Sequence, residues 1–332
     1  MQIGYAVHSV TSPQGDARAA HRVLFLYLQT GAGHLGPCRS IAAAMETLAP
    51  GTETLLVNAI DPEERGRRRL IENGYRVSAS TLPFLWTLMY ELSMARAVMT
   101  WNQESSDRFT RRYLRKVITE FRPTRIVNAH SLLTVPLQRA QRDLGTRIPA
   151  WTLVTDPFSV HPFWFHRSRT STIVMSPGIR AVADRVKDFH APLLVRAPVI
   201  QPRFEREPDP ADIRAFRERE GFRPDRKLVL IAGGGEGIFG GERFLHAILE
   251  SGADCDVALV AGRNELLKLQ SRLVLKLPHI RPKLEGRTVK IYGFVDFMYE
   301  LLHASDLVLT KGGASTIWEI MLSARPAIFC QF

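Results

Sequence analysis

Residues 227–249, KLVLIAGGGEGIFGGERFLHAIL, carry the strongest indication of the fold. The apolar run that follows Lys227 is typical of a strand buried on both faces of a parallel sheet. A glycine-rich turn, residues 233–237, comes next, and the segment after it is predicted to be a helix. Strand, glycine-rich turn and helix in this order are the opening unit of a doubly wound α/β domain, with the turn at the carboxyl end of the strand.

The same arrangement recurs in the first half of the chain. There RVLFLYLQT (Arg22–Thr30) is predicted to be a buried strand, GAGH (Gly31–His34) the turn and Ser40–Leu48 the helix. Between the two halves, Ala197–Pro210 contains four prolines and little apolar periodicity. This composition is typical of a linker between domains.

Apolar runs alternate with predicted helices through both halves, which indicates βαβ units and mostly parallel sheets. Further strands are predicted at residues 52–60, 125–130, 150–156, 256–263, 289–295 and 306–313. We therefore expect two doubly wound, Rossmann-like domains, residues 1–198 and 199–332. The last predicted strand, Pro326–Phe332, has no covering helix after it, so the sequence is expected to be a truncated version of a longer protein.

Composition narrows the class of protein. The 332 residues are 45% hydrophobic and 23% charged, which is ordinary for a globular chain, and no apolar run is long enough to span a bilayer. No secretory signal is recognisable, and three cysteines without metal-like spacing favour a reducing compartment. We expect the cysteines to be buried thiols.

The net charge of +11 is distributed unevenly. Residues 1–200 hold 25 Lys and Arg against 15 Asp and Glu, whereas residues 201–332 hold 19 against 18. A basic excess in one half indicates an anionic partner, either phospholipid or nucleic acid. The alternative is an arginine-rich composition without a function.

The second glycine-rich turn is a candidate phosphate site. Backbone amides of Gly233, Gly234, Gly235, Glu236 and Gly237 could approach a phosphate at the start of the following helix. Close packing of strand against helix is the alternative reason for the glycines. A plain NAD or FAD domain is disfavoured, because the spacing of the glycines does not fit and the next strand ends in an arginine, not in an acidic residue.

A comparable turn follows the predicted strand at residues 306–311. Lys311 is followed by Gly312-Gly313-Ala314-Ser315-Thr316 and a helix, and Glu319 lies about one helical turn further on. A carboxylate there could accept both ribose hydroxyls of a nucleotide. A capping box between Thr316 and Glu319 explains the same residues equally well.

Three polar side chains stand at the ends of predicted strands in the first half. They are His34, His130 and Asp156. Because the carboxyl ends of parallel strands meet at one edge of a sheet, we expect all three near one crevice. The imidazole of His34 is suited to accept a hydroxyl proton at neutral pH, although a single histidine in a loop is more often structural.

Six motifs in order resemble glycosyltransferase family 28, in particular the monogalactosyldiacylglycerol synthases and processive diacylglycerol glucosyltransferases, and more distantly the peptidoglycan N-acetylglucosaminyltransferase. The motifs are GAGH (31–34), VTDPFSVHPFWFH (154–166), AGGGEG (232–237), AGRN (261–264), YGFV (292–295) and TKGGASTIWE (310–319). The resemblance runs from about Arg22 to Phe332. It implies the GT-B fold, in which two such domains face each other across a cleft.

The resemblance also implies roles for individual residues. His34 matches the general base. The donor-binding positions are Gly233, Gly234, Gly235, Glu236, Gly237, Arg263, Asn264, Phe294, Lys311, Gly313, Ser315, Thr316 and Glu319. Gly33, His130, Asp156 and His161 match positions at the acceptor side of the cleft, whereas Trp164 and His166 are expected to pack. The family usually has Ala-Gly-Pro-Gly-Thr after the lysine, so the different turn here leaves the preferred sugar open.

The membrane is the expected anionic partner. Ser80–Met99 is amphipathic and aromatic, and Phe84, Leu85 and Trp86 could lie in a bilayer interface, although a core helix has the same pattern. The basic segment Arg108–Arg125 lacks any nucleic-acid motif, so no nucleic acid is expected. Asp254-Cys255-Asp256 has a metal-binding form but stands at the amino end of its strand, away from the cleft.

The sequence therefore predicts an inverting transferase that uses a UDP-sugar as co-substrate and a lipid acceptor, without a cofactor or metal. It is expected in the cytoplasm, attached peripherally to the inner face of the cell membrane. Two alternatives remain open: a UDP-sugar 2-epimerase, and a non-catalytic membrane protein that binds a nucleotide sugar.

Overall fold

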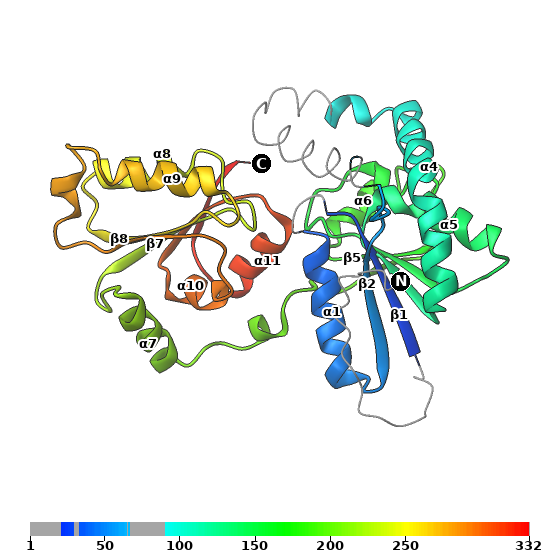
Figure 1. The fold of residues 1–332 in the computed structure, drawn as a ribbon, viewed down its shortest axis with the longest axis horizontal. Coiled ribbons are helices and arrows are strands. Elements are labelled where there is room, and N and C mark those ends of the chain that lie inside the picture. Colours follow the sequence, from blue (N-terminus) through cyan, green and yellow to red (C-terminus); the bar gives the residue numbers. More distant parts are fainter. Residues whose placement is uncertain (1–20, 30–32, 65, 67–89, 332) are drawn as a thin grey trace. The chain divides into compact units, whose positions relative to one another are not determined.

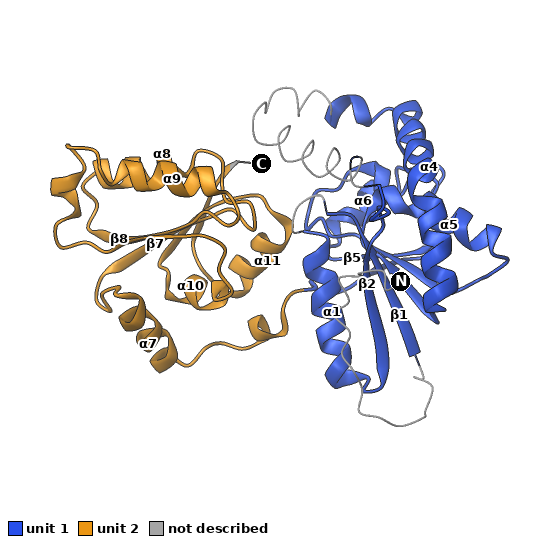
Figure 2. Cartoon of the chain, in the orientation of Figure 1, with its two compact units in different colours: residues 1–199 blue, residues 200–332 orange. Residues whose placement is uncertain are grey.

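The computed structural model describes residues 21–29, 33–64, 66 and 90–331. The chain divides into two compact units, residues 1–199 (unit 1) and residues 200–332 (unit 2) (Figure 2). Each unit has a parallel sheet of its own with helices on both faces (Figure 1). The α/β class and the doubly wound architecture are confirmed.

Unit 1 has a six-stranded sheet in the order β2-β1-β3-β4-β5-β6, and every pair of neighbours is parallel. The strands are β1 (His21–Tyr27), β2 (Thr52–Asn58), β3 (Arg125–Asn128), β4 (Ala150–Leu153), β5 (Ser171–Val174) and β6 (Leu193–Val195). The chain crosses from β1 to β2 on one side and returns to β3 on the other. The crevice of the sheet therefore lies at the carboxyl ends of β1 and β3.

Strand β1 shows why the sheet is covered on both faces. Its side chains alternate, so Leu24 and Leu26 enter one apolar cluster and Val23 and Phe25 enter another. The first cluster contains residues of α4 (Arg96–Phe121) and α5 (Thr134–Asp143), and the second contains residues of α1 (Leu35–Leu48). The apolar residues of β1, Val23 to Tyr27, are thereby all buried, whereas His21 at its start is exposed.

Unit 2 repeats the architecture with a five-stranded parallel sheet in the order β11-β10-β7-β8-β9. Its strands are β7 (Lys227–Ala232), β8 (Cys255–Val260), β9 (Val289–Tyr292), β10 (Leu307–Lys311) and β11 (Ala327–Gln331). Its helices are α7 (Pro210–Glu220), α8 (Gly241–Glu250), α9 (Glu265–Val274), α10 (Met298–Ala304) and α11 (Ala314–Leu322). The crevice of this sheet lies at the carboxyl ends of β7 and β10.

Several elements differ from the prediction. Strands β5 and β6 and the short helix α6 (Gly178–Ala183) were not predicted, because each is only three to six residues long. The proline-rich stretch is only in part a connection, since the 3-10 helix η3 (Pro202–Glu205) places Phe204 in the core of unit 2.

Helix α4 runs from Arg96 to Phe121, so it contains the end of Ser80–Met99 and most of the basic segment Arg108–Arg125. The end of the predicted interfacial segment is therefore part of α4, where Met99 is buried. Phe84, Leu85 and Trp86 lie outside the described residues. In the part of the chain that the structure describes, no helix is both long and apolar enough to cross a bilayer.

Three of the six basic residues of α4, Arg96, Arg111 and Arg115, contact acidic side chains of unit 1. Arg111 contacts Asp107 and Asp143, the last residue of α5, and Glu104 of α4 receives both Arg139 and Arg167. These ion pairs join α4 to α5 and to the segment around Arg167. In unit 2, Asp256 is fully buried and accepts the backbone N–H groups of Arg223 and Thr288, which is a structural role.

Candidate functional site

His34 lies at the crevice of unit 1, where it immediately precedes α1. Its Nδ1 atom is 2.8 Å from the carbonyl oxygen of Ala129, after β3, and 3.0 Å from the hydroxyl oxygen of Thr155, after β4. A carbonyl oxygen can only accept, so Nδ1 carries the proton of the neutral ring and Nε2 is the basic nitrogen. Burial lowers the pKa of His34 to about 4, although the bond to Ala129 acts in the opposite direction. The ring is therefore neutral at pH 7.

His130 packs directly on His34, with the ring centroids 4.4 Å apart. Its Nδ1 accepts the backbone N–H of Leu132 at 3.2 Å and caps the 3-10 helix η1 (Ser131–Leu133). Burial, and then the neighbouring His34, holds the pKa of His130 well below its usual value. Both histidines were predicted to lie at one edge of the sheet, and in the structure their rings are in contact. His130 has a capping role.

Asp156 accepts a hydrogen bond from Trp164, a residue that was predicted only to pack. The indole Nε1 of Trp164 donates to Asp156 Oδ2 at 2.7 Å, and the Trp164 ring lies 6.1 Å from that of His34. Burial raises the pKa of Asp156, while the bond from Trp164 lowers it. Trp164 thus lies between Asp156 and His34 in the crevice. The only feature of the sequence that hints at this contact is the short separation of eight residues between Asp156 and Trp164.

His161 caps the 3-10 helix η2 (Pro162–Trp164), which carries that tryptophan. Its Nδ1 accepts the N–H of Phe163 at 3.0 Å, and its Nε2 lies 2.9 Å from the hydroxyl oxygen of Ser93. Both ring nitrogens are therefore engaged. His161 positions the loop around Asp156, and Gly33 adjoins His34 in the preceding turn.

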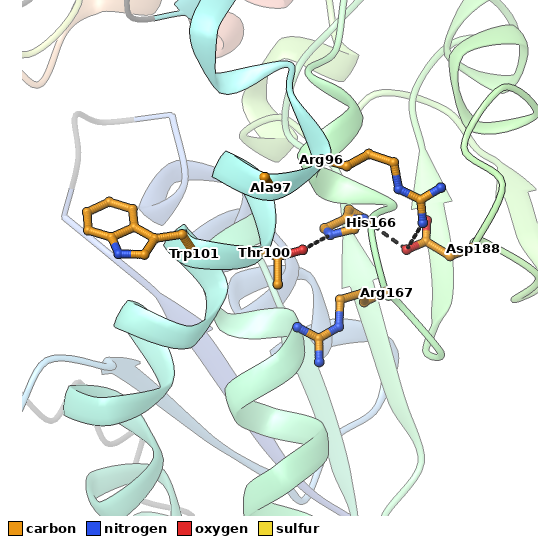
Figure 3. Close-up of a pocket in the computed structure, with 7 residues that line it drawn as sticks. All are labelled: Arg96, Ala97, Thr100, Trp101, His166, Arg167 and Asp188. Atoms are coloured by element: carbon orange, nitrogen blue, oxygen red, sulfur yellow. Dashed lines mark hydrogen bonds and ion pairs between the residues drawn. The ribbon is translucent and has the colours of Figure 1, made fainter.

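A separate pocket of about 680 Å³ lies on unit 1 between α4 and the segment after η2 (Figure 3). It is lined by Arg96, Ala97, Thr100, Trp101, His166, Arg167 and Asp188. His166 Nε2 is 3.0 Å from the Thr100 hydroxyl oxygen, and its Nδ1 is 2.9 Å from Asp188. Arg96 also contacts Asp188 and Arg167 contacts Glu104, so the charges of this pocket are already compensated.

In unit 2 the glycine-rich turn after β7 is packed against the turn after β8. A Cβ on Gly262 would lie 2.3 Å from the Gly235 carbonyl oxygen, and a Cβ on Gly237 would lie 2.6 Å from that of Ala261. The N–H of Arg263 donates to the same Gly235 oxygen at 2.8 Å. Gly237 and Gly262 also have positive φ, so backbone contact by itself requires glycine at both positions.

The turn after β10 adjoins the turn after β7. A Cβ on Gly234 would lie 3.6 Å from the Thr316 hydroxyl oxygen. Helix α11 begins at Ala314 with Gly313 as its N-cap, so Thr316 lies inside the helix and no side chain caps its start. The capping-box alternative for Thr316 and Glu319 is therefore wrong. The Ser315 hydroxyl oxygen is buried and makes no hydrogen bond to any described residue, although buried hydroxyls are normally paired.

Two ionisable residues beside these turns have shifted pKa values. Burial raises the pKa of Glu319 to about 7, and Arg203 only partly opposes this effect. Burial lowers the pKa of Lys311, and the carboxylate of Glu236 in the glycine-rich turn partly restores it. The crevice of unit 2 thus holds one lysine and one carboxyl group that titrates near neutrality.

The remaining predicted donor residues surround the turn after β8. The Arg263 guanidinium lies over the Phe294 ring at 4.6 Å, and the Phe294 side chain is 59% exposed. Asn264 is the N-cap of α9, where its side-chain oxygen accepts the N–H of Leu267 at 2.9 Å. Asn264 therefore has a local structural role, whereas Arg263 and Phe294 present a flat cationic and aromatic surface.

Two family models match this chain. Residues 243–332 match the family model for the glycosyltransferase family 28 C-terminal domain, and residues 38–185 match that for monogalactosyldiacylglycerol (MGDG) synthase. The resemblance to glycosyltransferase family 28 is confirmed. Relatives match along nearly the whole chain: a chloroplastic monogalactosyldiacylglycerol synthase of Spinacia oleracea is 27% identical over 96% of this chain and 60% of its own length.

A second relative is a processive diacylglycerol beta-glucosyltransferase of Bacillus cytotoxicus, which is 23% identical over 92% of this chain and 75% of its own length. The chain spans about 60% of the length of the first curated relatives that it matches. Among solved structures, MurG of Acinetobacter baumannii superposes with a TM-score of 0.53 at 13% identity, covering 94% of this chain and 78% of that one. Alr3699/HepE of Anabaena, in complex with UDP and glucose, gives 0.52 at 15% identity, covering 93% and 80%. These likenesses show the GT-B fold.

Proposed function

We propose that this chain is an inverting glycosyltransferase that transfers a hexose or N-acetylhexosamine from a UDP-sugar to a lipid acceptor such as diacylglycerol. The names of the family 28 relatives support the reaction and the acceptor class. The observation that carries the proposal is the state of His34. Its proton is held on Nδ1 by the Ala129 carbonyl, and the basic Nε2 belongs to a ring that is neutral at pH 7.

In the proposed reaction, His34 Nε2 takes the proton of an acceptor hydroxyl as its oxygen attacks the anomeric carbon of an α-linked UDP-sugar. The bond from that carbon to the diphosphate oxygen breaks, UDP leaves with the electron pair, and the product is a β-glycoside. His34 later releases the proton to solvent. The acceptor hydroxyl is poorly acidic, so general-base assistance is the main contribution asked of unit 1.

Unit 2 would bind the donor and stabilise the leaving UDP. Amides of the turn 233–237 and of the first turn of α11, with the Lys311 ammonium, would face the diphosphate, where they act as fixed dipoles and charge. A phosphate oxygen would also supply a partner for the Ser315 hydroxyl. Glu319 would accept the ribose hydroxyls, and no divalent cation is required in this scheme.

The experiment is transfer from radiolabelled UDP-glucose, UDP-galactose or UDP-N-acetylglucosamine to diacylglycerol in mixed vesicles. The expected result is a labelled glycolipid whose anomeric proton has the β configuration by NMR, with the signal lost in His34→Ala. Conversion of the UDP-sugar to its 2-epimer without acceptor would instead identify an epimerase. Tight donor binding without either product would leave only the non-catalytic alternative.

We also propose that unit 1 binds an anionic membrane surface, because residues 1–200 carry the basic excess and Phe84, Leu85 and Trp86 offer an apolar anchor in the sequence. The protein should sediment with vesicles that contain phosphatidylglycerol and bind poorly to phosphatidylcholine alone. Phe84→Ser with Trp86→Ser should remove the part of the binding that resists high salt, without changing UDP affinity. Equal binding to both kinds of vesicle would overturn the charge argument.

A further inference from the structure

Three side chains of types that can bind a metal lie close together on the surface of unit 2, away from the crevice. His246 and Glu250 lie four residues apart on α8, and His279 lies after α9, just before the 3-10 helix η4 (Arg281–Leu284). One ligand atom from each of the three residues lies within 4.8 Å of the other two. Residues four apart share one face of a helix, so His246 and Glu250 can address the same ion.

The two imidazole rings point their Nε2 atoms at each other. The distance between these atoms is 3.1 Å, and the rings are inclined at 71°. Two nitrogens that bind one Zn²⁺ at about 2.05 Å and a tetrahedral angle are about 3.3 Å apart. The two rings form a hydrogen bond at this spacing, which is also close to that of two ligands of one tetrahedral ion.

The carboxylate of Glu250 has one oxygen already engaged and the other turned to the histidines. Oε1 lies 3.2 Å from the Lys283 ammonium, and Oε2 lies 3.9 Å from His279 Nε2. Lys283 also donates to the backbone oxygen of Glu250 at 2.9 Å. A second group that fixes the free oxygen of a ligating carboxylate is a common feature of metal sites.

We propose that His246, Glu250 and His279 bind a divalent transition metal, with Zn²⁺ as the best match to two imidazoles and one carboxylate. Water completes the tetrahedron. Thiolates do not take part, since none of the three cysteines belongs to the cluster. Protons and the metal compete for the same imidazole nitrogens, so affinity falls in acid.

The ion would join the last turns of α8 to the segment that follows α9. These turns lead into the amino end of β8, whereas the glycine-rich turns lie at the carboxyl ends of β7 and β10. The metal therefore stabilises unit 2 without contacting the donor. The proposal is independent of the transfer reaction, and a metal-independent reaction is compatible with it.

The experiment is calorimetric titration of tag-free, EDTA-treated protein with ZnCl₂. We expect one equivalent to bind, with affinity at least 10-fold weaker in His246→Ala and in His279→Ala and unchanged in His190→Ala, which removes an exposed histidine outside the cluster. Co²⁺ should give the intense d–d bands of a tetrahedral site without a sulfur-to-metal charge-transfer band.

Melting temperatures provide a second readout. Without metal, all four proteins should melt alike, because the substituted side chains are at least partly exposed. Zn²⁺ should raise the melting temperature of wild type and His190→Ala in proportion to the logarithm of its concentration, and should not raise that of the two cluster variants. UDP affinity should be the same with and without Zn²⁺. Equal Zn²⁺ affinity in wild type and cluster variants, or no binding by wild type, would overturn the proposal.

Discussion

The Nδ1 atom of His34 is 2.8 Å from the carbonyl oxygen of Ala129, although the two residues are 95 positions apart in the chain. They meet because β1 and β3 are neighbours in the sheet and both residues lie just past the carboxyl ends of these strands. The backbone of β3 thereby selects the tautomer of a side chain that follows β1. The partner of Nδ1 is a neutral carbonyl. A carboxylate in its place would raise the basicity of the ring.

Replacement of His34 by alanine should lower kcat by about 10²–10⁴-fold, the usual effect of removing a general base. UDP affinity should stay within about twofold of wild type, since the donor residues belong to unit 2. Transfer kinetics and calorimetry with UDP measure the two quantities. If kcat and UDP affinity fell together, His34 would be a donor-binding residue.

The acid limb of the pH profile should lie unusually low. The base must be unprotonated, and the pKa of His34 is lowered to about 4, so kcat at saturating UDP-sugar, where the bound ribose keeps Glu319 ionised, should remain level from pH 7 to about pH 5. A midpoint near 6.5, the ordinary histidine value, would contradict a buried neutral ring. The unfolded chain takes up this proton between pH 6.5 and 4 while the folded chain does not, so the His34 contribution to stability is lost as the pH falls through that window.

Glu319→Gln should stabilise the unliganded protein at pH 8.5 by up to about 3 kcal/mol and have little effect at pH 4. The folded pKa of Glu319 is raised from 4.5 to about 7, so its contribution is favourable below pH 4.5 and is lost as the pH rises through 7. Glutamine removes the cost of the buried charge. Melting of both proteins at the two pH values tests this, and a variant that is less stable at pH 8.5 would contradict it.

The same substitution should weaken UDP binding at pH 8 by roughly 1–3 kcal/mol, because it removes charge-assisted hydrogen bonds to the ribose. A gain in stability with a loss of affinity is the combination expected for a residue kept for its ligand. Calorimetry on Glu319→Gln, with the melting curve as proof of folding, measures the loss. Unchanged UDP affinity would exclude Glu319 from the donor site.

Gly262→Ala should destabilise unit 2 by more than about 3 kcal/mol and abolish UDP binding, since the new Cβ would lie 2.3 Å from the Gly235 oxygen. Gly252→Ala is the matched control: its φ of +74° is as strained as the +62° of Gly262, but no atom lies within 4 Å of the added carbon. The control should lose only about 1–2 kcal/mol, the cost of the backbone conformation. Similar losses in urea unfolding would show that the backbone contact is unimportant.

The sequence predicted the main strands because their apolar runs are continuous, as in β1 and β7. It could not predict β5 and β6, which are too short for their periodicity to be distinctive. The start of α4 at Arg96 was not predicted, since its first residues belong to Ser80–Met99, whose apolar residues also suit a bilayer interface. The glycine-rich turns were found readily, because few other residues allow such close contact of backbones.

The sequence predicted where the residues of the candidate site lie, but not their contacts or their burial. Parallel strands place His34, His130 and Asp156 at one edge, and the order of residues alone indicates this. The link through Trp164 depends on where the loop after β4 folds back, which no local pattern specifies. The pKa of Glu319 likewise depends on burial by the packed unit.

The order of strands in the sheets has a consequence for synthesis of the protein. β1 can pair with β2 soon after both leave the ribosome, but its other edge waits for β3, about 100 residues later, or roughly 5 to 20 seconds at the usual rates of translation. During that interval the backbone N–H and C=O groups on one edge of β1 are unpaired and can pair with a wrong strand. All six strands of unit 1 are synthesised before β7, so the order of synthesis allows the two units to fold one after the other.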